Sequence, residues 1–176
     1  MQNFSSETLN NIRSKFSQID NCPIQGKRIF FENAGGALTL KSVVECSKKY
    51  AAIPDNQGRD NPGSKELVKV INKAKNDMRS FMNASSGQFF VGESGTELLF
   101  RLIMNACLGT DNKGQVLGST VEHPATRSAC ARWAKISGKE HILVPHNDQT
   151  GSVTNNEYSN YITADTRVLL FYTLHL

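Results

Sequence analysis

The chain has 176 residues, of which 39% are hydrophobic and 20% charged, and its net charge is +4. This composition is that of a globular domain with a core of its own, and it excludes disordered and fibrous classes. No apolar run approaches the ~20 residues of a membrane span, and residues 1–10 lack the apolar stretch of a secretory signal, so we expect a cytoplasmic protein without membrane contact.

The basic residues form no stripe interleaved with aromatics, so nucleic acid is not an expected partner. The four cysteines lack metal-ligand spacing, and Cys107 and Cys130 are expected to be buried, inert thiols.

The first half of the sequence predicts helices separated by polar turns. Apolar residues recur at helical spacing in three stretches, and prolines and glycines interrupt the chain between them. In chain order, the expected elements are a helix over 5–18, a strand over 28–31, a turn over 33–36, a helix over 40–52, a polar loop over 54–64 and a helix over 65–83 capped by Ser64.

The second half predicts strands that alternate with helices. In chain order, they are a strand over 89–91, a helix over 97–107, a strand over 115–118, a helix over 125–136, a strand over 141–144, a short helix over 156–162 and a strand over 166–173. This alternation is typical of a parallel sheet with helices on both faces, so the fold class is α/β. The helix over 97–107 is apolar nearly all round, and we expect it to lie between the sheet and another layer.

One candidate site is the segment Val91–Glu97, which carries two glycines and two hydroxyl residues where a helix is expected to begin. Backbone N–H groups at a helix N-terminus lack partners within the helix and bind anions such as phosphate. The same residues suit a helix cap equally well, with Ser94 or Thr96 as the capping side chain. The motifs of a P-loop, a nucleophile elbow and a dinucleotide-binding turn are absent. Phosphate binding and capping both stay open for this segment.

A second candidate is the turn Thr120–Thr126, in which His123 and Pro124 follow an expected strand. Open α/β sheets bind ligands at the carboxyl ends of their strands. A surface or capping histidine is the alternative, and the turn alone favours it. Two such turns on consecutive strand–helix units favour a shared ligand site. His141 and His146 flank the next strand and are interpreted as structural.

A third segment, Phe30–Ala37, contains two consecutive glycines and fits either a tight turn or the wall of a ligand entrance. Together and in this order, the segments resemble the class V aminotransferase family, which includes cysteine desulfurases and selenocysteine lyases. The matching segments are Phe31–Gly36, the loop over 54–64, the helix over 65–83, Ser94–Glu97, Val121–His123 and the strand over 166–173. Ordered agreement of this kind is more specific than any single motif.

The resemblance implies an aspartate-aminotransferase-like large domain, PLP fold type I, truncated, over residues 28–176 after an N-terminal helical segment over 1–27. It implies pyridoxal 5′-phosphate (PLP) as the cofactor and a homodimer in the complete protein, with the site near the subunit interface. Gly95 and Thr96 would then hold the cofactor phosphate. His123 would stack on the pyridine ring, and Asn33 would lie near the amino-acid substrate.

The implied reaction is the loss of sulfur or selenium from cysteine or selenocysteine, or a related elimination or transamination. In the family, the Schiff-base lysine and the acidic partner of the ring nitrogen lie downstream of the strand that matches 166–173. We therefore interpret the chain as the N-terminal part of such an enzyme, inactive by itself. The position where the family often has a second histidine is Pro124. Two alternatives stay open: a catalytically inactive remnant that acts as an interaction module, and an unrelated phosphate-binding α/β module.

Overall fold

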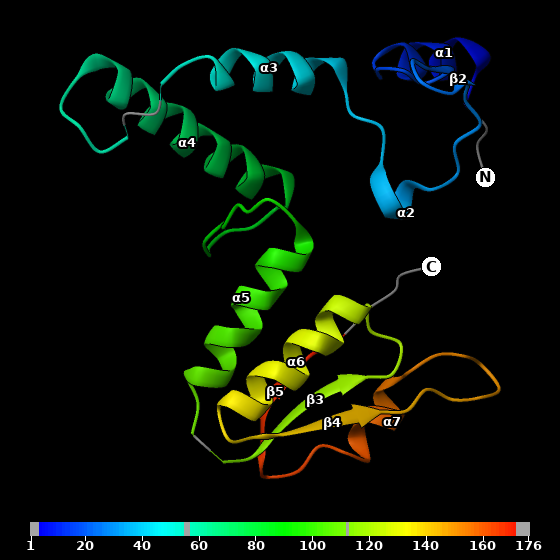
Figure 1. The fold of residues 1–176 in the computed structure, drawn as a ribbon, viewed down its shortest axis with the longest axis vertical. Helices are drawn as coiled ribbons and strands as arrows, with labels where there is room; N and C mark the ends of the chain where they lie inside the picture. The colour runs from blue at the N-terminus through cyan, green and yellow to red at the C-terminus, as the bar shows by residue number, and fades with distance from the viewer. Residues whose placement is uncertain (1–3, 55–56, 112, 172–176) are drawn as a thin grey trace. The chain divides into compact units, whose positions relative to one another are not determined.

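A computed structural model describes residues 4–54, 57–111 and 113–171 (Figure 1). These residues form two compact units, which divide between Met82 and Asn83. The boundary expected between residues 27 and 28 lies within the first unit and stays a prediction. None of the described helices is both long and apolar enough to cross a lipid bilayer.

The first unit consists of helices and one short antiparallel hairpin. Its elements are α1 (Ser6–Ser14), β1 (Asn21–Cys22), β2 (Gly26–Lys27), α2 (Asn33–Gly36), α3 (Lys41–Ala51) and α4 (Pro62–Phe81). The three predicted helices of this half are present with shifted ends, and the predicted turn over 33–36 is a single helical turn. The strand predicted over 28–31 is wrong. A strand needs a hydrogen-bonded neighbour, and the hairpin partner of β2 pairs only as far as Lys27.

The start of α4 corrects the predicted cap. Asn61 is the capping residue, and its side-chain Oδ1 accepts a hydrogen bond of 2.9 Å from the Ser64 backbone N–H. Pro62 occupies the first helical position, where its missing N–H costs nothing. Ser64 therefore lies inside the first turn of α4, where it is buried. The Asn-Pro pair was the stronger start signal, and the prediction of Ser64 as the cap was wrong.

The second unit contains a three-stranded parallel sheet. Its elements are α5 (Gly95–Leu108), β3 (Gln115–Ser119), α6 (Pro124–Ile136), β4 (Glu140–Val144), α7 (Asn155–Ser159) and β5 (Thr166–Leu169). The strand order is β4–β3–β5, and β3 pairs in parallel with both neighbours. The α/β prediction is confirmed.

The strand predicted over 89–91 is wrong, since these residues are not in a strand and Phe90 is 83% exposed. The predicted strand over 166–173 ends at Leu169, and positions 172 and 173 lie outside the described residues.

Helices cover both faces of the sheet, as predicted. On one face, α5 and α6 pack on β3 and β5 through a buried core of Ile103, Cys107, Val116, Ala129, Cys130, Ala134 and Val168. On the other face, Tyr158 of α7 packs on Leu117 and Val144.

Cys107 and Cys130 are buried as predicted, and burial raises the pKa of both thiols, that of Cys130 to about 12. Leu102 on the outer face of α5 is 65% exposed, so the second layer expected over α5 is not supplied by the described part of the second unit and stays a prediction.

Lys139 ties the C-terminal end of α5 to the start of β4. Its side chain is buried, and Nζ donates hydrogen bonds to the carbonyl oxygens of Cys107 at 2.9 Å and Thr110 at 3.5 Å. Carbonyl groups in the last turn of a helix have no partners within the helix, and a cation there also complements the helix dipole. Lys139 therefore fixes the position of the α5 C-terminus at the amino end of β4.

We predict that Lys139→Met lowers the free energy of unfolding by about 1–3 kcal/mol, because it removes the Nζ donor from two carbonyl groups at the C-terminal end of α5. Lys135→Met, at an exposed site near the end of α6, should change it by less than about 0.5 kcal/mol. Urea titration followed by the fluorescence of Trp133, the only tryptophan of the chain, measures both. Equal effects of the two substitutions would contradict this role of Lys139.

Candidate functional site

The N-termini of α5 and α6 lie at the same end of the sheet, the carboxyl end of β3. His123, the N-cap of α6, follows β3 after a short turn. The opposite end of α5 is fixed to the amino end of β4 by Lys139, so α5 also runs antiparallel to the strands. Figure 1 shows both helices running back along the sheet against the direction of the β3 arrow. The two predicted turns therefore share the edge of the sheet where α/β proteins bind ligands.

The N-terminus of α5 combines a cap with free donors. Ser94 is the N-cap, and its Oγ accepts from the Glu97 N–H at 3.1 Å. The Glu97 carboxylate accepts from the Glu93 N–H at 2.9 Å. The backbone N–H groups of Gly95 and Thr96 have no partner among the described residues. Capping thus uses Ser94, while the N–H groups of Gly95 and Thr96 stay without a partner among the described residues.

Open space lies in front of Gly95. A Cβ atom added to this residue would meet no heavy atom within 4 Å. The Thr96 side chain is also exposed, and its hydroxyl has no hydrogen-bond partner among the described residues. Two free N–H groups, a free hydroxyl and the positive end of the helix dipole are the donor set that binds a phosphate group.

His123 is held in one orientation by its own helix. Its Nδ1 accepts a hydrogen bond of 3.2 Å from the Ala125 N–H, so the proton of the neutral ring is on Nε2. The His123 side chain is exposed, and its carbonyl oxygen accepts from the N–H groups of Thr126 and Arg127. His123 therefore caps α6, which is one of the roles considered for it. This cap uses only Nδ1, so the faces of the imidazole ring stay accessible.

A hydrogen-bonded pair at the same edge was missed in the sequence. Thr120, which follows β3, bonds through Oγ1 to His146 Nδ1 at 3.0 Å and accepts from the His146 N–H at 3.0 Å. These bonds link the loops after β3 and β4. Since both residues come directly after expected strands, the parallel order of the strands was the only signal that could have brought them together.

Asn33 belongs to the first unit, in α2, whereas Gly95, Thr96 and His123 belong to the second. The Asn33 side chain is exposed. Its predicted place near the substrate stays a prediction.

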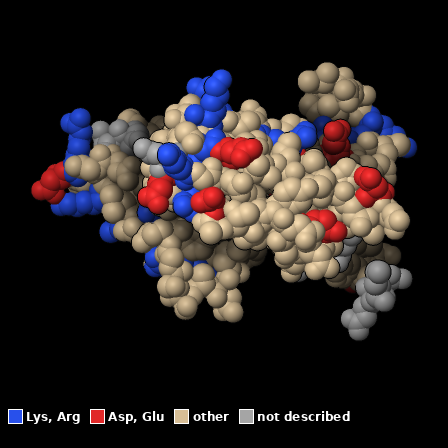
Figure 2. All heavy atoms as spheres, turned by 90° about the horizontal axis from the view of Figure 1, so that it is seen from below, with Lys and Arg blue, Asp and Glu red and all other residues tan. Residues whose placement is uncertain are grey.

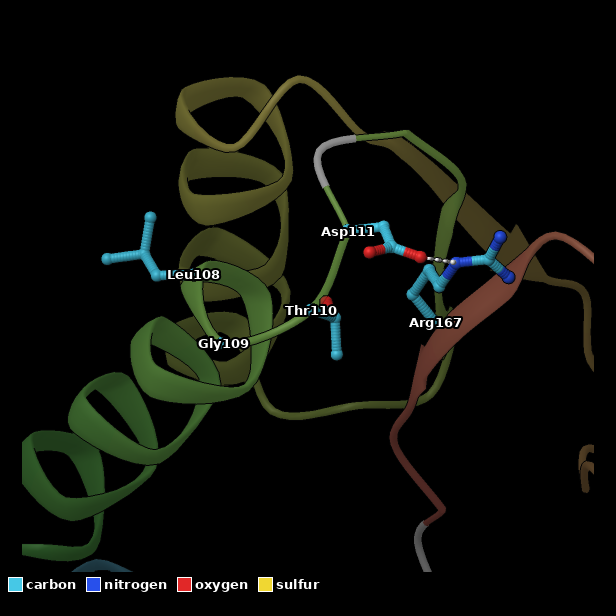
Figure 3. Close-up of a pocket in the computed structure, with 5 residues that line it drawn as sticks. All are labelled: Leu108, Gly109, Thr110, Asp111 and Arg167. Carbon is cyan, nitrogen blue, oxygen red and sulfur yellow. Dashed lines mark ion pairs between the residues drawn. The ribbon is translucent and has the colours of Figure 1, made fainter.

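An open hollow lies at the other end of the sheet. It is lined by Leu108, Gly109, Thr110, Asp111 and Arg167. In Figure 3, Asp111 and Arg167 point toward one another, with 4.0 Å between Oδ2 and Nε, and Leu108 points away from them. The hollow is at the C-terminus of α5 and the start of β5, opposite to Gly95 and His123, so it is not part of the candidate site.

The face of the molecule that Figure 2 shows has no charged area suited to a polyanion. On the face that Figure 2 shows, basic and acidic side chains are interspersed, without a large area of one sign. Within the described residues, no group of three or more His, Cys, Asp or Glu side chains is arranged to hold a metal ion. The local donors at the carboxyl edge of β3 therefore decide what this site can bind.

A family model described as Aminotransferase class-V matches residues 29–175. The chain belongs to the class-V aminotransferase family. The match covers nearly the whole chain, including α2, the N-terminus of α5 and the turn that carries His123. A comparison with curated proteins finds no match.

Among solved structures, the chain is similar to the cysteine desulfurase CsdA, in its S-sulfonic acid form, from Escherichia coli. The TM-score is 0.65 at 19% sequence identity, over 91% of this chain and 40% of CsdA. At this identity the likeness shows the fold, and it confirms the predicted PLP fold type I. The chain spans less than half the length of that enzyme.

Class-V aminotransferases are PLP-dependent, and the residues at the carboxyl edge of β3 fit this cofactor. The free donors of Gly95 and Thr96 and the open space before them suit its phosphate group. The exposed, oriented ring of His123 suits a flat aromatic partner.

We predict that Ser94→Ala lowers the free energy of unfolding by about 1 kcal/mol, because it removes the acceptor for the Glu97 N–H. Thr96→Ala removes a hydroxyl that bonds to no described residue and should change it by less than about 0.5 kcal/mol. Thermal or urea unfolding of both variants measures the difference. A larger loss for Thr96→Ala would mean that Thr96 is needed by the fold and is not free for a ligand.

Proposed function

We propose that this chain is the cofactor-binding part of a PLP-dependent enzyme of the cysteine desulfurase type, which acts on cysteine or selenocysteine. The observation that carries the proposal is the pair of free N–H groups at Gly95 and Thr96, at the same end of the sheet as His123. Membership of the class-V family supports PLP as the ligand. The fold shared with a cysteine desulfurase supports the substrate class.

In this proposal, the N-terminus of α5 binds the cofactor phosphate. The N–H groups of Gly95 and Thr96 and the Thr96 hydroxyl donate to its oxygens, and each charge-assisted bond contributes about 1.5–3 kcal/mol. The helix dipole adds to this attraction without any side-chain charge. Gly95 is suited to this role because it has no side chain to keep the phosphate away from its N–H.

His123 positions the aromatic ring. Its Nδ1 is occupied by the Ala125 N–H, which restrains the imidazole ring, and stacking on a face of that ring would orient the pyridine. The bound cofactor supplies an electron sink for cleavage of a bond in the amino-acid substrate. Asn33 lies near the substrate in this proposal. The complete protein is proposed to be a cytoplasmic homodimer.

Gly95→Ala provides a direct test of phosphate binding. The added methyl group meets nothing in the protein, but it occupies the space that an anion needs to reach the two N–H groups. We expect PLP affinity to fall at least about tenfold, which corresponds to about 1.4 kcal/mol. The free energy of unfolding should stay equal or rise slightly, because alanine favours a helix over glycine. Quenching of Trp133 fluorescence during PLP titration measures affinity, and inorganic phosphate should compete with PLP.

Ser128→Ala is the matched control, since it alters an exposed position within α6 and should leave PLP affinity unchanged. Two results would overturn the proposal. One is a wild-type chain whose fluorescence PLP does not quench in a saturable manner. The other is a Gly95→Ala chain that binds PLP as tightly as the wild type.

A further inference from the structure

The acidic residue next to His123 is buried. The Glu122 side chain is 7% exposed, although His123 beside it is exposed. The turn thus sends one side chain inward and the next one outward. A carboxylate loses much of its hydration on burial, and this is costly unless a cation or several hydrogen bonds replace the water.

Glu122 has little compensation for the loss of water. Its hydrogen-bond partner is Ser119, whose hydroxyl lies 3.3 Å from Oε1, a long distance for such a bond. No lysine, arginine or histidine among the described residues forms an ion pair with it. Burial accordingly raises the pKa of the Glu122 carboxyl, and the Ser119 hydroxyl offsets only part of this effect.

The groups that face Glu122 from the two helix layers do not supply a positive charge. They are Cys130 of α6 and Tyr158 of α7, and an ionised Glu122 raises the pKa of both. Burial is the largest cause of the raised pKa in each case, so both are neutral when Glu122 titrates. Neither group therefore offers a positive charge that would stabilise an ionised Glu122, and burial remains the cause of its raised pKa.

The backbone links Glu122 to the orientation of His123. The Glu122 N–H donates to the Ser119 carbonyl oxygen at 3.5 Å, which closes the turn after β3. His123 follows at once and begins α6. An ionised Glu122 gains hydration only by moving toward solvent, and this movement would displace the turn between Ser119 and Pro124 that carries the imidazole ring.

We propose that Glu122 is a positioning residue for His123, and that its buried carboxyl fulfils this role only in the neutral form. The inference rests on the proposed function in that His123 is taken to contact the cofactor ring. Proton linkage fixes the direction in which pH changes the stability that Glu122 contributes. Because the carboxyl binds its proton more tightly in the folded chain, its stabilising contribution is present below its ordinary pKa of 4.5 and is lost as pH rises through the raised pKa.

Glu122→Gln tests the inference in the full 176-residue chain, because glutamine keeps the shape of a neutral carboxyl and does not ionise. The first measurement follows the His123 imidazole signals by NMR from pH 4 to pH 9, without any ligand. We expect the wild-type signals to show a transition at the pH where Glu122 titrates. This transition should be missing from Glu122→Gln.

The second measurement is the pH dependence of PLP affinity, from Trp133 quenching. Wild-type affinity should fall about tenfold as pH rises through the Glu122 transition, relative to Glu122→Gln at the same pH. Effects of pH that do not depend on Glu122 are common to both proteins and cancel in this ratio. Glu140→Gln makes the same change at an exposed position at the amino end of β4 and should behave as the wild type.

The two proposals fail in different ways. If PLP does not quench the wild-type chain, the proposed function is wrong, and the NMR titration still decides whether Glu122 positions His123. If His123 shows the same transitions in the wild type and in Glu122→Gln, the positioning role is wrong, whatever the result with PLP. The positioning role is also wrong if the ratio of the PLP affinities of the wild type and Glu122→Gln does not change with pH.

Discussion

Parallel pairing of β3 with β4 and β5 is the constraint on which the site depends. A chain that forms consecutive parallel strands must return to the starting edge between them, so a connecting helix runs antiparallel to the strands. The helix α6, which connects β3 to β4, consequently begins at the carboxyl edge. Lys139 fixes the C-terminal end of α5 at the other edge, so the N-terminus of α5 lies at the carboxyl edge as well. The positive ends of the two helix dipoles thus lie at the carboxyl edge, where an anionic ligand gains most from them. Gly95 and His123 are separate in sequence, and the strand order together with the Lys139 contact places them at one edge.

The core beneath this edge contains titratable groups, and burial drives them to their neutral forms. The pKa of the Cys107, Cys130 and Glu122 side chains is raised by loss of hydration, and that of His141 is lowered for the same reason. A charged group here would need a partner that the two faces of the sheet do not offer. The buried exception is Lys139, whose ammonium group is satisfied by helix carbonyl oxygens at the opposite edge. Among the buried groups of the second unit, the charged Lys139 thus lies at the amino edge, while the carboxyl edge has the N-termini of α5 and α6.

The sequence correctly predicted the elements whose formation depends only on the residues of the segment itself. The predicted apolar runs form β3 and β4, and the start of the run over 166–173 forms β5. The segments around Gly95 and His123 lie at helix N-termini as predicted, although only His123 follows a described strand. The runs at 28–31 and 89–91 have similar composition, but a strand also needs a backbone partner, and none of the described strands pairs with them. Ser94 could not be distinguished from Thr96 as the cap of α5, because both are hydroxyl residues one position away from Gly95. The contacts of Thr120 with His146 and the burial of Glu122 depend on strand order and packing, which no local pattern contains.

The two parts of the proposed site differ in how they respond to protons. Backbone N–H groups and a helix dipole do not titrate, so the protein's contribution at Gly95 and Thr96 is constant over the range in which the fold is stable. The turn that carries His123 rests on a buried carboxyl, and its geometry is tied to a group that does titrate. A change in pH would therefore leave the donors at the phosphate end in place and act on the ring end. In an enzyme that uses an aromatic cofactor, this arrangement would keep the donors that hold the cofactor while its reactive ring loses alignment.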